Sequence, residues 1–455
     1  MQYEPYFSAT HECDTATQAA AEGVSPKIFY DALNRPFRTE LPDGSFTQTT
    51  WTAWEQIVWD NNDTVLESQW YEERKDLLPA TNPERIAAMK AAEHANTPTV
   101  MHTDTLARPF YTLQYLSPID DVIPSVVEGY VSLDIQGNRL SVRDGRGNDA
   151  LQYRYNMLQA PCYQLSIDSE AGRTLLDVAG QPLYAWDAED REFSMEYDEL
   201  RRNTGKWLKG TGQLEMTIYG ESTPNPEVLN LRGQVYERYD ASGKQFVPQG
   251  YDFKGNPIES HLQLVLDKTL ADPDWDASPP ALDDEVFISS ATFDALNRPV
   301  TQTDPGNHIT SYVYDKGGAL KKVLLDGNLY VQDIHYDAKG QRQAIWYGNG
   351  TKTGYTYDAQ TYRLRRLLTI KLSANEQLQD LNYYYDPVGN ITEIRDDAQQ
   401  AIFFNNTVVS PTQQYTYDAL YRLIEARGRE QKNNADFGSS DNTGDAAMQS
   451  MNPLK

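Results

Sequence analysis

Short runs of alternating apolar and polar residues, separated by turn residues, recur along the chain at nearly constant spacing. The pattern is clearest at residues 293–358, where an aromatic residue and an aspartate precede each turn, at Asp294, Asp315, Asp337 and Asp358. These aspartates are 21 or 22 positions apart, and a fixed period of about 20–50 residues is typical of repeat architectures. The sequence therefore predicts one supersecondary unit repeated many times.

The residues of one repeat predict a β-hairpin. Aspartate can accept a hydrogen bond from the backbone two residues on, and a following Gly or Asn tolerates the left-handed conformation of a tight turn. An apolar or β-branched run then leads to a second turn, as at Asp326-Gly327, and Asp-Gly between such runs indicates a hairpin. A lone hairpin is marginally stable in water, so we expect an all-β protein whose hairpins pair into one long antiparallel sheet.

The repeat extends to both ends of the chain. The phrase at residues 29–36 nearly duplicates the one at 293–299, which ties the two regions to one system. We expect the strand-end aromatics, the aspartates and the turn glycines to be structural residues of the repeat turns. They are Tyr30, Asp31, Phe293, Asp294, Tyr314, Asp315, Tyr336, Asp337, Gly340, Tyr357, Asp358, Tyr385, Asp386, Gly389, Tyr417 and Asp418.

Three internal stretches depart from the repeat. Residues 46–70 are rich in Trp and alternate enough to predict strands. Residues 82–95 predict an inserted surface helix packed on the sheet, with Asn82 as its cap and Pro83 at the first helical position. Residues 268–287 are rich in Asp and contain two adjacent prolines, which indicates an acidic loop.

The two ends carry no repeat. Residues 1–28 have little pattern and read as a lead-in to the repeat region at 29–428. Residues 429–455 lose aromatics and gain Asn, Ser, Gly and Asp, which predicts a polar, disordered tail. The first residues have neither a basic start nor an apolar run, so we expect no Sec-type signal peptide in this chain.

Composition narrows the classes of partner. The net charge is −26, with 66 acidic and 40 basic residues, which argues against nucleic acid or an anionic membrane because both require clustered cations. The sequence lacks the run of roughly 18 apolar residues that a membrane span needs, so we expect no direct membrane insertion. Cys13 and Cys162 are too few for a disulfide framework.

Candidate chemistry is sparse. The six histidines have no metal-ligand spacing, and no nucleophile elbow or phosphate-binding loop occurs. We therefore expect no metal, no cofactor and no enzymatic activity. Asp386, followed by Pro387, is open to a reading as half of a catalytic acid pair, but its place after Tyr385 favours an ordinary repeat aspartate. The tyrosines suggest sugar stacking or, more simply, packing between hairpins.

The repeat phrases resemble the Rhs/YD-repeat family over roughly residues 29–428. Longer strings are similar to the C-terminal, shell-forming half of the B component of bacterial insecticidal toxin complexes. These strings are residues 62–71, 94–98, 384–400 and 415–426.

The resemblance implies a long β-sheet that spirals into part of a hollow shell enclosing a cytotoxic effector polypeptide. The implied partners are a C-type shell and effector component and a pore-forming A-type component, and the implied location is extracellular, within a secreted virulence complex. The family's N-terminal β-propeller has no counterpart before residue 1, and Asp386 lies within a repeat rather than at a shell-to-effector junction. We therefore expect a partial shell without self-cleavage, with edge strands at 29–41 and 415–426 meeting other shell parts.

Two other functions stay open on the sequence. An extracellular YD-repeat adhesion or glycan-binding protein would show an exposed aromatic patch and measurable glycan binding. A self-cleaving aspartyl protease would need two close carboxylates and would lose cleavage on an Asp→Asn change.

Overall fold

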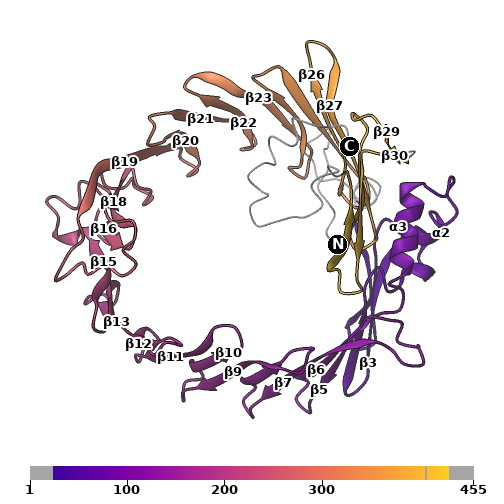
Figure 1. Cartoon of the computed structure of the whole chain (residues 1–455), viewed down its shortest axis with the longest axis horizontal. Coiled ribbons are helices and arrows are strands. Elements are labelled where there is room, and N and C mark those ends of the chain that lie inside the picture. The colour runs from indigo at the N-terminus through magenta and orange to yellow at the C-terminus, as the bar shows by residue number, and fades with distance from the viewer. Residues whose placement is uncertain (1–23, 405–406, 430–455) are drawn as a thin grey trace. The chain divides into compact units, whose positions relative to one another are not determined.

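The computed structural model describes residues 24–404 and 407–429 (Figure 1). Within these residues, 30 strands form a single antiparallel sheet, and two more, β29 (Ile402–Phe404) and β30 (Thr407–Val409), form a separate hairpin. The all-β class and the long antiparallel sheet of hairpins are confirmed. The chain divides into two compact units, the first comprising Met1–Tyr130 and Val331–Lys455 and the second Val131–Tyr330.

Unit 1 contains two groups of strands from distant parts of the sequence. In each group, strands consecutive in sequence pair antiparallel. The exception is β31, which pairs with β28 because the β29–β30 hairpin between them in sequence lies outside the sheet. The N-terminal group is β1 (Lys27–Tyr30), β2 (Pro36–Glu40), β3 (Phe46–Trp51), β4 (Glu55–Trp59), β5 (Thr99–Thr103), β6 (Pro109–Tyr115) and the start of β7 (Val126–Leu133). The C-terminal group is most of β23 (Asn328–Tyr336), then β24 (Arg342–Tyr347), β25 (Thr351–Tyr357), β26 (Leu364–Lys371), β27 (Glu376–Tyr385), β28 (Ile391–Asp396), β31 (Thr412–Tyr417) and β32 (Leu423–Arg427).

Unit 2 is a meander of short strands with one 3₁₀ turn, η2 (Gly220–Ser222). Its strands are β8 (Arg139–Arg143), β9 (Asp149–Tyr155), β10 (Pro161–Ser166), β11 (Glu170–Leu176), β12 (Pro182–Trp186), β13 (Glu192–Tyr197), β14 (Asn203–Leu208), β15 (Gly212–Tyr219), β16 (Val235–Asp240), β17 (Gly243–Phe246), β18 (Glu259–Val265), β19 (Leu282–Phe293), β20 (Pro299–Thr303), β21 (Ile309–Tyr314) and β22 (Leu320–Leu325). From β8 to β22 each strand pairs antiparallel with the next. Successive connections therefore alternate between the two edges of the sheet.

The connection between β4 and β5 carries η1 (Val65–Glu67), α2 (Gln69–Glu72) and α3 (Pro83–Ala92). Asn82 caps α3 by accepting a hydrogen bond from Glu84 N at 2.9 Å, which satisfies one of the free N–H groups of the first turn. The buried face of α3, formed by alanines, packs with Val65 and Trp70 into a small apolar core. The helix also contacts β27 and β28, so it joins the two strand groups of unit 1.

Two expectations about local structure need correction. Strands were expected throughout 46–70, but they end at Trp59 and the chain is helical from Val65, because Val65 and Trp70 are buried against α3. The acidic loop expected at 268–287 is shorter, because β19 begins at Leu282 and pairs there with Val265 of β18.

The chain ends were also part of the expected domain division. The tail at 429–455, apart from its first residue, and the lead-in at 1–28 up to residue 23 lie outside the described residues. The division at 28 and 428 therefore stays a prediction.

Candidate functional site

The repeat aspartate closes its turn in a way that Asp294 illustrates. Its Oδ1 accepts hydrogen bonds from Leu296 N at 2.9 Å and Arg298 N at 3.0 Å, and its Oδ2 accepts one from Arg298 Nε at 2.8 Å. The side-chain hydrogen bond from Arg298, followed by the backbone bonds, lowers the pKa of Asp294. One ionised carboxylate thus satisfies two backbone donors that the turn leaves unpaired.

The other repeat aspartates accept backbone N–H groups two to four residues on in the same manner. These are Asp31, Asp315, Asp337, Asp358, Asp386 and Asp418. The left-handed residue of each turn is Gly or Asn in most repeats, for example Gly340 at φ 80° and Asn297 at φ 67°. A structural role for these residues is a prediction that turn variants test.

The strand-end tyrosines connect neighbouring turns along one edge of the sheet. Tyr314 Oη donates to Pro299 O at 2.8 Å, and Tyr385 Oη donates to Leu364 O at 2.8 Å. Tyr357 and Tyr417 make the corresponding bonds to residues 342 and 391. Each hydroxyl reaches the carbonyl at the start of the preceding paired strand, so these tyrosines serve local contacts within the sheet.

Two repeat turns of unit 1 meet the β4–β5 connection, which is distant in sequence. Asn62 Nδ2 donates to Asp386 Oδ2 at 2.9 Å, and Tyr421 Oη donates to Asp60 Oδ2 at 2.5 Å. Lys90 on α3 adds a bond from its Nζ to the carbonyl of Tyr415 at 2.6 Å. We call Asp60, Asn62, Asp63, Asp386 and Tyr421 the latch cluster, because two hydrogen bonds among them join the two strand groups of unit 1 and Asp63 accepts a hydrogen bond from Asp60 N.

Burial dominates the electrostatics of the latch cluster. It raises the pKa of Asp63 to about 7, with the charge of Asp60 adding to the effect, while hydrogen bonds from Asp60 N and Thr97 oppose it. Burial, and then the neighbouring Asp60, also raises the pKa of Tyr421. Tyr421 is therefore a neutral hydroxyl donor near neutral pH.

Paired carboxylates are a common arrangement for acid–base chemistry, but here their oxygens are engaged in the fold. Asp60 Oδ1 accepts from the backbone of Asn62 and Asp63, and Asp63 accepts from Thr97 N, Thr97 Oγ1 and Asp60 N. A cavity of about 170 Å³ adjoins the pair, lined among others by Val58, Tyr115 and Leu420. The geometry is that of a polar joint between two segments.

Asp386 is held in its own turn as well as in the latch cluster. It is 4% exposed, and its Oδ1 accepts from Gly389 N and Asn390 N, each at 2.7 Å. Arg363 donates to the carbonyls of residues 386, 387 and 388, all at 2.8 Å. The structure therefore places Asp386 in the position that the repeat aspartate interpretation expects.

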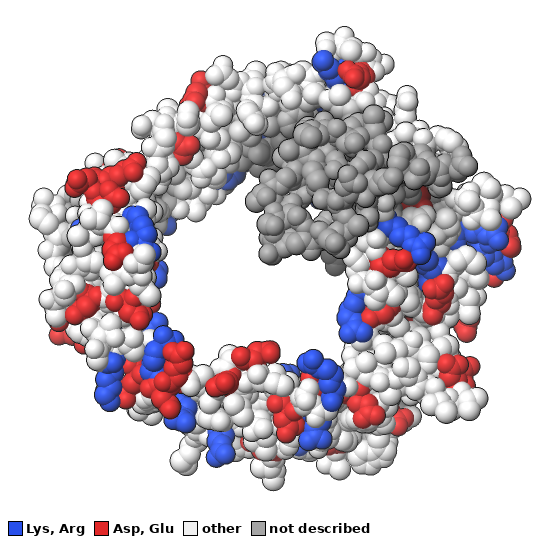
Figure 2. Space-filling view, in the orientation of Figure 1, with Lys and Arg blue, Asp and Glu red and all other residues white. Residues whose placement is uncertain are grey.

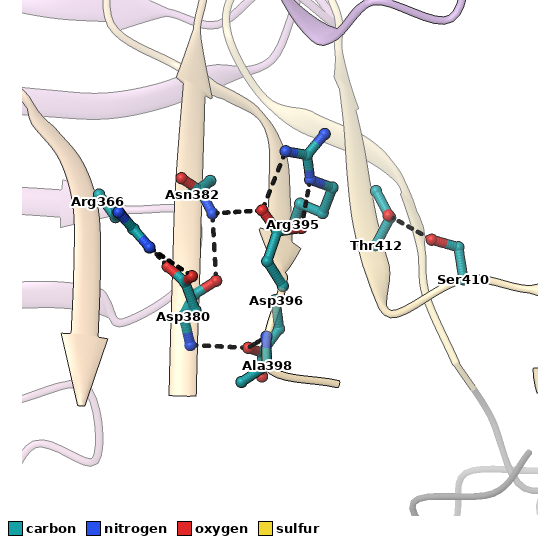
Figure 3. A network of polar contacts seen from close by, with 9 residues as sticks. Arg366, Asp380, Asn382, Arg395, Asp396, Ala398, Ser410 and Thr412 are labelled. Atoms are coloured by element: carbon teal, nitrogen blue, oxygen red, sulfur yellow. Dashed lines mark hydrogen bonds and ion pairs between the residues drawn. The ribbon is translucent and has the colours of Figure 1, made fainter. Parts of the chain in front are cut away.

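A second polar network lies on β26, β27 and β28 (Figure 3). Arg366 forms two hydrogen bonds with Asp380, from Nε to Oδ1 at 2.6 Å and from Nη2 to Oδ2 at 2.7 Å. Asp380 N in turn donates to Asp396 Oδ1 at 2.9 Å. This network therefore links the three neighbouring strands through charged side chains as well as through their backbone hydrogen bonds.

Charge elsewhere is dispersed. On the face seen in Figure 2, acidic and basic side chains are interspersed. Within residues 24–404 and 407–429, no group of three or more His, Cys, Asp or Glu residues is arranged to hold a metal ion. His11 and Cys13 lie outside these residues. No helix in the described part of the chain is long and apolar enough to cross a membrane.

Sequence reasoning identified Asp386 but missed its partners in the latch cluster. Asn62, Asp63 and Tyr421 do lie in strings similar to toxin-complex shells, at 62–71 and 415–426. That similarity was the available signal. Their mutual contact could not be inferred, since it joins positions 324 residues apart.

The repeat turns and the single long sheet define an all-β repeat protein that resembles the Rhs shell of Tc toxins. No family model matches the sequence. The chain is 30% identical over 289 residues to Toxin subunit YenC1 of Yersinia entomophaga, a match covering 59% of this chain and 29% of that protein. It is 33% identical over 232 residues to Toxin subunit YenC2 of the same organism, covering 48% of this chain and 24% of that protein.

Solved structures agree in fold. A crystal structure of TcdB2-TccC3-TEV matches with a TM-score of 0.81 and 26% identity over 93% of this chain and 20% of that chain. The Photorhabdus luminescens Tc holotoxin pore with the mutation TccC3-D651A matches with a TM-score of 0.77 and 27% identity, over 89% of this chain and 19% of that chain. The resemblance to toxin-complex shells is confirmed. The chain spans less than a third of the length of each of these relatives.

Proposed function

We propose that this chain is a structural, non-enzymatic segment of a toxin-complex Rhs shell that encloses a cytotoxic effector before its delivery through a pore-forming component. The observation that carries the proposal is the antiparallel sheet that 30 strands form in the described residues, together with the match to TcdB2-TccC3-TEV over 93% of the chain. A wall of this kind pairs its backbone groups internally. A polypeptide held behind it would be kept from proteases and from its targets.

The ends of the sheet suggest how the shell is completed. Of the described strands, β1 pairs with β2 and β32 pairs with β31, which leaves each with one free edge. Both strands are exposed along their length, including Ile28 and Ile424. A free edge of this kind is a site for strand addition, so we propose that companion shell components pair there.

The identity of the companion follows from which component this chain represents. The sequence resemblance was to the B component, which implies a C-type companion, whereas the two curated relatives are the toxin subunits YenC1 and YenC2. In either case, the complete complex would include a pore-forming A-type component and would act outside the producing cell. The engagement of the Asp60 and Asp63 carboxylates in backbone hydrogen bonds supports a structural role for the chain.

The test is protection of a cargo. The chain would be produced in two pairings, one with TcdB2 and one with TccC3, each with a protease-sensitive reporter as the cargo. Each purified complex would then be treated with protease. We expect the reporter to be protected in one pairing and the scattering profile of that complex to be hollow. An Ile28→Lys or Ile424→Lys change should abolish assembly if the corresponding free edge is used. Equal reporter cleavage in both pairings would contradict the proposal.

A further inference from the structure

Unit 2 exposes a row of apolar side chains at the tips of its repeat turns. Five of these tips are Leu158, Val178, Leu200, Phe253 and Leu296, which are between 69% and 91% exposed. Each is one or two residues after the Asn or Asp that closes its turn. We call these five residues the YD rim.

The YD rim occupies one edge of the sheet. Its turns follow β9, β11, β13, β17 and β19, and connections after odd-numbered strands of this antiparallel meander fall on the same edge. The connections on the opposite edge are mostly polar or charged, for example 144–148, 187–191, 209–211 and 304–308. The two edges of unit 2 therefore differ in chemistry.

The spacing of the YD rim limits what can cover it. Neighbouring strands in a sheet lie about 4.8 Å apart, so turns two strands apart are about 10 Å apart, and the turns after β13 and β17 are about twice that distance apart. The partner must present recesses with the same period along a twisted line. The edge of another antiparallel hairpin sheet has this period because it is built on the same strand spacing.

Unit 1 shows what such a tip does when it is covered. Leu420 holds the rim position in the turn of Asp418, and it is not exposed. It lines the cavity together with Val58 of β4 and Tyr115 of β6. Val58 and Tyr115 lie at the C-terminal ends of β4 and β6, on the edge of the sheet opposite to the repeat turns of this strand group. A repeat turn from one strand group of unit 1 thus packs on the opposite edge of the other strand group.

We propose that the YD rim of unit 2 is a docking surface for the edge of a second YD-repeat sheet, supplied by another part of the shell. This inference rests on the proposed function and adds to it the contact by which one tier of sheet is held on the next. The relatives provide room for such a tier, since this chain spans 29% of YenC1. The docking would bury apolar tips that a soluble protein otherwise leaves in water.

The test compares the two edges of unit 2. The rim variant is Leu158→Glu, Leu200→Glu and Leu296→Glu together. The matched control is Ile167→Glu with Leu266→Glu, because both residues are exposed and apolar but lie on the opposite edge, after β10 and β18. All five positions are exposed, so we expect both variants to keep the wild-type thermal midpoint and far-ultraviolet circular dichroism.

Binding to purified TcdB2 and TccC3 would then be measured by sedimentation velocity. We expect the wild type and the control to bind one of these shell components and the rim variant to bind it at least about tenfold more weakly. Equal binding by the rim variant, or an equal loss in the control, would overturn the docking surface. Self-association of the wild type that disappears in the rim variant would assign the occupant to a second copy of this chain and overturn the proposed one.

The outcome is separable from that of the proposed function. If the Ile28→Lys or Ile424→Lys change abolishes cargo protection and the rim variant leaves it intact, the docking proposal fails while the shell function stands. If the wild type neither binds a shell component nor protects a cargo, both proposals fail.

Discussion

The side-chain amide of Asn62 donates a hydrogen bond from Nδ2 to Asp386 Oδ2 at 2.9 Å, although the two residues are 324 positions apart in the sequence. Asn62 is fully buried, and its oxygen has no hydrogen-bond partner among the described residues. Asp386 meanwhile closes a repeat turn through its other oxygen. The side-chain amide of Asn62 therefore links the segment between β4 and β5 to a repeat turn of the C-terminal strand group.

Replacing Asn62 by Ala should weaken this joint. The change removes a hydrogen bond to a buried carboxylate, and the free energy of unfolding should fall by about 2 kcal/mol. Urea denaturation measures it. Asn148→Ala is the control, because Asn148 is an exposed turn residue of unit 2 that bonds within its own turn. Equal losses in the two variants would show that the connection to Asp386 has no special weight.

Stability should depend on pH through Asp63. Its pKa is about 7 in the folded protein against 3.8 for the ordinary group, so the folded state binds more protons than the unfolded state between these values. The resulting stabilisation is complete below about pH 4 and is lost as pH rises through 7, with each unit of pKa difference corresponding to about 1.4 kcal/mol. Asp63→Asn should flatten the pH dependence of the unfolding free energy between pH 5 and 8.

Other titratable groups also make the unfolding free energy depend on pH and must be separated from Asp63. The turn aspartates, such as Asp294 and Asp418, have lowered pKa values, so their stabilisation is lost only as pH falls below about 4. His308 has a raised pKa because of its hydrogen bond with Asp326, so its contribution to stability is lost as pH rises, as is that of Asp63. A His308→Gln background removes its contribution, and a slope that is unchanged there by Asp63→Asn would refute the prediction.

Two turn glycines should respond differently to alanine. Gly340 and Gly389 both have positive φ, 80° and 119°, which disfavours a side chain. A Cβ on Gly340 meets nothing within 4 Å, whereas one on Gly389 comes within 3.0 Å of the Arg363 guanidinium, which is held by three carbonyls. We expect losses of about 1 kcal/mol for Gly340→Ala and about 2–3 kcal/mol for Gly389→Ala. Thermal unfolding distinguishes them, and the reverse order would refute the role of Arg363.

The ion pair of Arg366 with Asp380 should contribute more to the free energy of unfolding than the nearby pair of Arg395 with Asp397. Asp380 is 3% exposed and loses two hydrogen bonds if Arg366 becomes Met. Because Arg366 itself is partly in solvent, we expect a loss of about 2 kcal/mol. Arg395→Met removes the more exposed pair with Asp397 and should cost less than about 1 kcal/mol. Denaturant unfolding of the two variants makes the comparison.

The repeat itself could be predicted because its information is local. Asp294 bonds to residues two and four positions on, and Asn297 supplies the left-handed turn within the same five residues. The alternation of apolar residues on either side then defines strands without reference to the rest of the chain. The helix expected at 82–95 lies at Pro83–Ala92 for the same reason, since its cap is the adjacent Asn82.

Elements that depend on distant residues could not be read in this way. The segment containing Val65 and Trp70 was expected to be a strand, and its helical form depends on burial against α3. Nothing local indicated that Asp63 would be buried, or that Tyr421 would reach Asp60 from a position 361 residues away.

The sequence by itself determined the all-β class, the hairpin period and the resemblance to toxin-complex shells, because short-range hydrogen bonds and side-chain alternation define each unit. Tertiary structure decided which turns are covered and which are exposed. Leu420 and Leu296 hold equivalent positions in nearly identical phrases, yet one lines a cavity and the other is 71% exposed. The difference arises from the segment that lies against each turn, and that neighbour comes from elsewhere in the chain or, as proposed for unit 2, from another shell sheet.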